Sequence, residues 1–163
     1  MRNHRLVATS LALMSCAVGV AGEPPTFETY SVLVQKAQQP AKVKLDSHPM
    51  GRKYRTVLKQ GALVGPNFAG HYTLVAWGCG TQCQTAAVID AQTGQVYFPS
   101  QLQPIAYQAV TDGTVPLQYK LDSRLLVAAG SARDRDDSIG LHYFVWTGRA
   151  LKEVLFVPKR WQR

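Results

Sequence analysis

Hydrophobic positions in the first third of the chain follow the spacing of one amphipathic helix. Four apolar side chains within residues 47–61 recur at intervals of three and four: Met50, Tyr54, Val57 and Leu58. Ser47 is a residue type that caps helix N-termini, and Gly61 is a residue type that often follows a helix end. The pattern therefore predicts a helix over residues 47–61.

After residue 70 the pattern changes to short runs of β-branched and aromatic residues bounded by turn residues, which is typical of strands. Residues 86–98 contain two such runs around the turn Ala-Gln-Thr-Gly and predict a hairpin. The remaining runs lie at residues 71–77, 117–121, 124–130, 139–146 and 151–158. Ahead of the helix, a further strand is suggested by Phe27, Tyr30, Val32 and Val34.

Two halves of this strand-rich region resemble each other. Gly78 corresponds to Gly130 and Gly94 to Gly148, at offsets of 52 and 54 residues, within a repeated order of strand, loop, strand, turn and strand. Each unit resembles three strands of a propeller blade, but two units are too few for a closed propeller. We therefore expect a mainly β fold with one helix, with two small antiparallel blade-like sheets packed as a sandwich or partial propeller.

The first 22 residues have the pattern of an export signal. Two arginines precede an apolar run of 16 residues, and small residues lie around position 22. The run is shorter than the roughly 20 residues that a transmembrane helix needs. The sequence predicts a signal peptide over residues 1–22 and a single exported, β-rich domain over residues 23–163 without a transmembrane span. Residues 13–16 also resemble a lipobox, so lipidation of Cys16 stays as an alternative to its removal.

Positive charge is concentrated around the predicted helix. The chain has 18 Lys and Arg against 10 Asp and Glu, and its 46% hydrophobic residues suit a soluble globular domain. Four cations form the candidate patch: Arg52, Lys53, Arg55 and Lys59. In an exported protein this patch favours an anionic envelope polymer or an acidic protein over nucleic acid. A solvated helix face is the alternative.

Cys79 and Cys83 remain after Cys16 is removed or lipidated, and an even number of cysteines in an oxidising compartment favours a disulfide. A redox thiol site and a Cu(I) site that includes His71 are the alternatives. Both alternatives need a helix after the second cysteine, whereas residues 84–90 have a strand-like pattern. We expect a structural disulfide and neither metal nor cofactor.

Sequence motifs of common enzymes are absent. The chain has no Gly-x-Ser-x-Gly, His-Glu-x-x-His or phosphate-binding glycine loop. The acidic segment 134–137 lacks the ligand spacing of an EF-hand, and His71 and His142 lie in strand-like runs where packed or surface histidines are more common than bases. The sequence therefore predicts a non-enzyme.

Residues 65–99 open with Gly-Pro-Asn-Phe-Ala-Gly-His-Tyr and continue through Trp-Gly-Cys-Gly-Thr-Gln-Cys-Gln; Leu-Asp-Ser-Arg-Leu-Leu-Val follows at residues 121–127. This combination resembles an uncharacterised group of small exported bacterial proteins. The resemblance implies export and the cysteine loop, and it implies no activity or catalytic residue.

These observations favour a periplasmic or secreted binding protein without catalysis that acts on a protein of the cell envelope, for example as an inhibitor or immunity-type protein. The loops at residues 64–70, 79–83 and 131–138 are the candidate contacts, because rigid β scaffolds present function on loops. A basic protein that binds an envelope polymer through the candidate patch is the first alternative. A thiol-redox or Cu(I) protein at Cys79 and Cys83 is the second.

Overall fold

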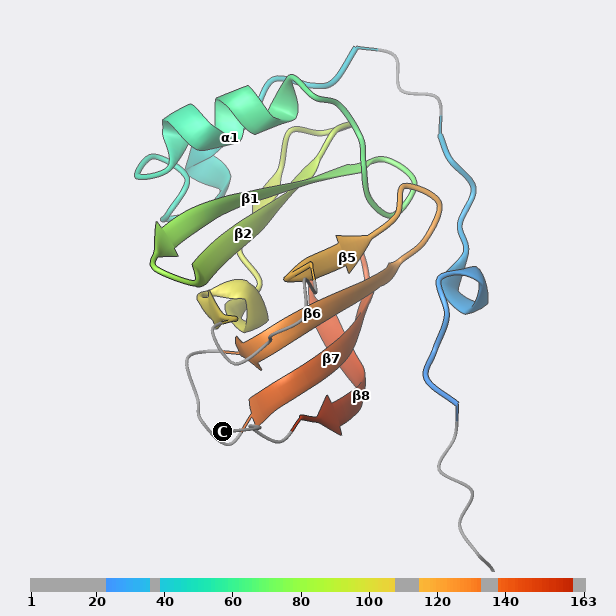
Figure 1. The fold of residues 1–163 in the computed structure, drawn as a ribbon. Helices are drawn as coiled ribbons and strands as arrows, with labels where there is room; N and C mark the ends of the chain where they lie inside the picture. Colours follow the sequence, from blue (N-terminus) through green and yellow to red (C-terminus); the bar gives the residue numbers. More distant parts are fainter. Residues whose placement is uncertain (1–22, 36–38, 108–114, 133–137, 160–163) are drawn as a thin grey trace, which may run out of the picture.

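The computed structural model of the chain describes residues 23–35, 39–107, 115–132 and 138–159. These residues form an antiparallel sheet of eight strands and a single α-helix, and the sheet is not closed into a barrel (Figure 1). The prediction of a mainly β fold with one helix is confirmed. The predicted signal peptide, including Cys16, and the acidic segment 134–137 lie outside the described residues.

The helix and strands follow one another as α1 (Arg55–Ala62), β1 (Tyr72–Gly80), β2 (Cys83–Asp90), β3 (Val96–Tyr97), β4 (Ile105–Ala106), β5 (Leu117–Tyr119), β6 (Leu125–Ala132), β7 (Ile139–Trp146) and β8 (Leu151–Pro158). The spatial order in the sheet is β1-β2-β4-β6-β7-β8, while β3 pairs with β2 and β5 pairs with β6. The meanders β1–β2–β3 and β6–β7–β8 are the two units of the predicted repeat.

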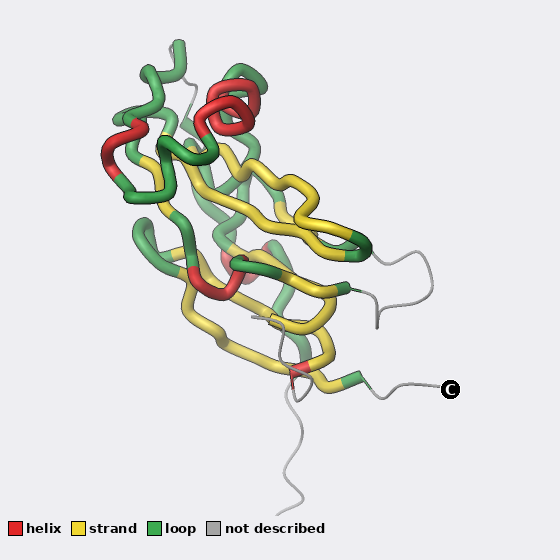
Figure 2. Tube along the Cα trace, turned by 90° about the vertical axis from the view of Figure 1, so that its left-hand side faces the viewer, coloured by secondary structure: helices red, strands yellow, loops and turns green. Residues whose placement is uncertain are grey.

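The two units belong to one continuous sheet, because the short strand β4 pairs with both β2 and β6. Seen from the side, the β1–β2 hairpin and the strands β6–β8 lie one above the other, and α1 covers the outer side of the hairpin (Figure 2). The largest core cluster contains Leu74 and Val88 from one unit together with Leu126 and Phe144 from the other. The units therefore pack face to face as in a sandwich, joined at one side by β4.

Trp146 lies at the centre of this packing. The side chain is 1% exposed, and its ring centroid lies 5.4 Å from those of Tyr72 and Tyr97 and 6.3 Å from that of Phe68. The two tyrosines meet the indole edge-on, a favourable arrangement of aromatic rings. Trp146 at the end of β7 thus connects the second unit to side chains of the first.

The helix is shorter than the sequence predicts. α1 begins at Arg55, and residues 48–54 form turns. Ser47 does not cap it; its hydroxyl accepts a hydrogen bond from Val96 N–H and donates to the Lys44 carbonyl. Gly51 packs directly against the Leu45 carbonyl, and the Cβ of any other residue at this position would overlap that carbonyl. These contacts hold the segment in a turn, so the helical spacing of Met50 does not produce a helix there.

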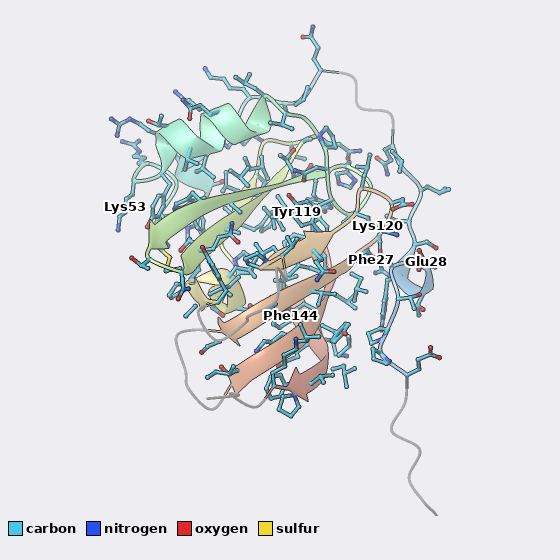
Figure 3. The ribbon with its side chains drawn as sticks, in the orientation of Figure 1. Phe27, Glu28, Lys53, Tyr119, Lys120 and Phe144 are labelled. Atoms are coloured by element: carbon cyan, nitrogen blue, oxygen red, sulfur yellow. A yellow bond between two sulfur atoms is a disulfide. The ribbon has the colours of Figure 1, made fainter. Side chains whose placement is uncertain are left out.

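Residues 27–35, here called the N-terminal strap, run along the second unit. The predicted strand is absent: Glu28–Tyr30 is a 3-10 turn, and only Ser31 makes an isolated bridge, to Ser123. Ser123 Oγ donates to the Phe27 carbonyl at 2.7 Å, and the Tyr30 carbonyl accepts from the Arg124 amide at 2.9 Å. Figure 3 shows Phe27 and Glu28 of the strap beside Lys120. Side-chain and backbone bonds to a loop therefore replace sheet pairing.

Candidate functional site

The two cysteines close the tip of the β1–β2 hairpin. Cys79 and Cys83 form a disulfide with their Cα atoms 5.2 Å apart, as the sequence predicts. The turn needs unusual backbone angles, with φ of 145° at Gly80 and 53° at Gln82. Residues 78–82 are all exposed. The result is a short, covalently closed loop that projects from a two-stranded ladder.

The surroundings of this disulfide differ from those of redox and copper motifs. The chain enters β2 at Cys83, where those motifs need a helix. Both sulfur atoms are bonded to each other, so neither offers a thiolate in this form. In the part of the chain that the structure describes, no group of three or more His, Cys, Asp and Glu side chains could hold a metal ion. The geometry favours a structural role for the disulfide.

Reduction of the disulfide is expected to lower the free energy of unfolding by about 2 kcal/mol, because a closed loop of this length restricts the unfolded chain by that amount. Urea denaturation with and without reductant measures the change. The double variant Cys79→Ser/Cys83→Ser is the control and should not respond to reductant. Equal stability of the oxidised and reduced wild-type protein would contradict the structural role.

The four candidate cations are exposed and follow one another along the turn before α1 and along α1 itself. Arg52 and Lys53 lie in the turn before α1, Arg55 is its first residue, and Lys59 lies one turn further. Arg52 is bonded to Asp46, and this hydrogen bond lowers the pKa of the Asp46 carboxyl. The first turn of α1 contains no acidic residue, so these cations add to the positive end of the helix dipole. Positive charge therefore accumulates at the start of α1.

A cluster of aromatic rings connects these cations to the hairpin tip. The Lys53 ammonium lies 5.3 Å from the ring centroid of Tyr54, which lies 4.8 Å from that of Trp77. Phe98 lies within 6.3 Å of both rings and 4.6 Å from His48. All four rings are half-buried. Figure 3 shows Lys53 beside the end of β1 that carries the disulfide.

We call the combination of residues 52–55, Trp77 and the exposed loop 78–82 the tip surface. The sequence predicted the cations and the disulfide of this surface, but nothing in it pointed to Trp77. The contact between Tyr54 and Trp77 has no signal in the sequence, because it depends on how α1 lies across β1.

The predicted contact loops do not form one surface. Residues 64–70 lie at the start of β1 and the cysteine loop at its end, roughly 27 Å away for a strand of this length. Phe68 is fully buried, and the Asn67 side chain pairs with both backbone groups of Leu74. This loop is therefore mainly structural. The connection between β6 and β7 begins on the cysteine side, because β4 links Cys83 to Ser131 through Ala106.

Two of the segments that carry the family resemblance meet beside a cavity. The Gly70 amide donates to the Leu121 carbonyl, and a cavity of about 370 Å³ is lined partly by His71, Tyr72 and Arg124. His71 Nε2 lies 3.8 Å from a carboxylate oxygen of Asp90. The neighbouring Tyr72 is partly buried, and this burial raises the pKa of its hydroxyl. Most donors to Asp90 come from the turn after β2, so this carboxylate mainly stabilises that turn.

His142 is a packed histidine. Its Nε2 donates to the Ser138 carbonyl at 2.6 Å, because a carbonyl oxygen only accepts. Nδ1 lies 2.7 Å from an oxygen of Glu153, and the ring stacks on Phe156. The side chain is 4% exposed and ties β7 to β8. This environment agrees with the structural interpretation of His142.

Comparison of the chain with protein-family models, with curated proteins and with solved structures finds no match. In the described ranges, no helix has the length and apolar composition that crossing a membrane requires. A functional assignment therefore depends on the geometry of the surfaces described above.

Proposed function

We propose that this chain is a non-catalytic binding protein that contacts an acidic protein partner through the tip surface. The proposal includes the predicted export, so the partner belongs to the cell envelope. The observation that carries it is the half-buried pair of Tyr54 and Trp77, flanked by Lys53 and Arg55 and continuous with the cysteine loop. Tryptophan, tyrosine and arginine are the residue types that dominate binding energy at protein interfaces.

The rigidity of the tip supports this function. The disulfide and the β1–β2 ladder hold residues 78–82 in one conformation, so binding orders little additional chain. A projecting loop of this kind suits insertion into a cleft of the partner. An inhibitor or immunity-type protein that blocks an envelope-directed hydrolase is the form of the function that this shape favours.

The charges of the tip surface indicate the chemistry of the partner. Within the described residues, neither Lys53 nor Arg55 pairs with a carboxylate. Unpaired cations of this kind accelerate association with a complementary acidic surface and select against basic partners. Aromatic rings between the cations favour a protein over a simple polyanion, because a polymer bound by charge alone makes no use of Trp77.

Capture from a cell-envelope extract, with the oxidised protein as bait and washes at low and high salt, tests the function. We expect one protein to be retained at high salt. Trp77→Ala should weaken its binding by about 30-fold, the effect of a hot spot of roughly 2 kcal/mol. The double variant Lys53→Glu/Arg55→Glu should slow association. The double variant Lys152→Glu/Lys159→Glu, with two exposed changes on and directly after β8 in the other unit, is the charge-matched control.

Loss of all captured material at high salt, with Trp77→Ala binding as well as the wild type, would contradict the proposal. That result would favour the alternative function, binding of an anionic envelope polymer through the candidate patch. Circular dichroism of each variant separates loss of binding from loss of fold.

A further inference from the structure

A groove separates α1 from the extended segment that precedes it. Its volume is about 500 Å³, within the range of small-molecule sites. One wall is the segment 40–43 and the other is the last turn of α1 with the residue after it, at positions 59, 60, 62 and 63. The apolar lining consists of Pro40, Ala41, Val43, Ala62 and Leu63. The groove is distinct from the tip surface, which lies at the opposite end of α1.

Two lysines stand at the rim of this groove. Lys42 and Lys59 come from opposite walls and also line an adjoining hollow of about 430 Å³, to which Lys44 contributes. Asp46, the acidic residue of that hollow, is engaged by Arg52. In the ranges that the structure describes, none of these lysines forms an ion pair with a carboxylate. The rim therefore offers positive charge to an anion.

Apolar surface continues from the groove into solvent. Leu63 is 86% exposed and lines the groove, and Val64, the next residue, is 76% exposed. Large aliphatic side chains that remain this exposed side by side favour contact with an apolar partner. The two properties, positive rim and apolar lining, are complementary to a ligand that carries an anionic group at the end of an apolar chain.

We propose that this groove binds a single-chain anionic amphiphile. The apolar chain lies along Val43, Ala62 and Leu63, and the anionic headgroup lies between Lys42 and Lys59. An uncharged chain would leave the lysines without a partner, and a free anion would leave the apolar lining exposed to water. The inference is independent of the protein-binding function, because it uses none of the residues of the tip surface.

Titration of the full, oxidised protein with dodecyl phosphate below its micelle concentration tests the proposal, followed by calorimetry and by backbone NMR shifts. Inorganic phosphate supplies the charge alone, and dodecyltrimethylammonium supplies the chain with the opposite charge. We expect saturable one-to-one binding of dodecyl phosphate, with shifts concentrated at residues 40–44 and 59–64, and weak binding of both comparison compounds.

The variant Lys42→Gln/Lys59→Gln should weaken binding by at least tenfold, because each lysine near an anionic headgroup contributes roughly a fivefold effect. Leu63→Ser should weaken it independently of charge. Lys152→Gln/Lys159→Gln, which neutralises two exposed lysines away from the groove, is the matched control and should bind like the wild type. Lys42 and Lys59 are both exposed, so their neutralisation should leave the fold intact.

Three results would overturn the proposal. Equal binding of inorganic phosphate would make the site a simple anion site, and equal binding of dodecyltrimethylammonium would remove the role of the lysines. Sedimentation with anionic phospholipid vesicles without saturable binding of dodecyl phosphate would assign the surface to a membrane instead of a single amphiphile.

Discussion

Replacement of Trp146 by alanine should lower the free energy of unfolding by about 4 kcal/mol, the effect expected when a large aromatic side chain is removed from a core. The cavity would open between Phe68, Tyr72 and Tyr97, whose rings pack against the indole. Most single domains are stable by only 5–15 kcal/mol, so the variant should be close to unfolding at ambient temperature. Urea denaturation followed by circular dichroism measures the difference.

Trp77→Ala is the matched control for this prediction. Trp77 is half-buried on the outer side of β1, so its removal should cost less than half as much as the removal of Trp146. Similar losses at the two positions would show that Trp146 does not hold the two units together. The modest cost at Trp77 also keeps that variant folded for the capture experiment.

Gly94→Ala should destabilise the protein by about 3 kcal/mol. Gly94 has a φ of 77°, a left-handed conformation that other residues adopt with strain. A Cβ at this position would also overlap the Lys42 carbonyl, and the Gly94 carbonyl accepts a hydrogen bond from the Lys44 amide. The added methyl group must therefore displace the segment 42–44, which carries Lys42 of the groove and Lys44 of the adjoining hollow. Denaturant titration and dodecyl phosphate binding should both report the change.

Gly65→Ala separates the two causes of this loss. Gly65 has a similar φ of 81°, but no atom lies within 4 Å of the place where a Cβ would be. The strain of the left-handed backbone alone should cost about 1 kcal/mol there. If both variants lost the same stability, the contact with Lys42 would be irrelevant, and the predicted damage to the groove would not occur.

The strands and their order of pairing within each unit could be predicted from the sequence because each is bounded by its own turn residues. The turn at Gly94 and the turn at Gly148 both have a positive φ, which explains why the repeat is visible as a recurring glycine. Sequence patterns were sufficient for features formed by residues that are close together in the chain. These features are a hairpin, a disulfide between residues four positions apart, and an exposed run of cations.

The parts that the sequence did not reveal depend on contacts between distant residues. The start of α1 is set by the hydrogen bond that the Val96 amide donates to the Ser47 hydroxyl and by the packing of Gly51, not by helical spacing. β4 is only two residues long and has no period to detect, yet it joins the two units into one sheet. The aromatic cluster and the groove both depend on where α1 lies. Export and the family resemblance stay predictions, since they rest on the sequence alone.

The strap has a consequence for the order in which the chain folds. Phe27 finds its hydrogen-bond partner, Ser123, 96 residues later in the sequence. Closing a loop of that length is entropically unfavourable until the intervening strands have assembled, so the strap should dock among the last steps of folding. Until then the strap would remain undocked, so residues 27–35 should stay accessible to proteases and to hydrogen exchange while β6, β7 and β8 pair.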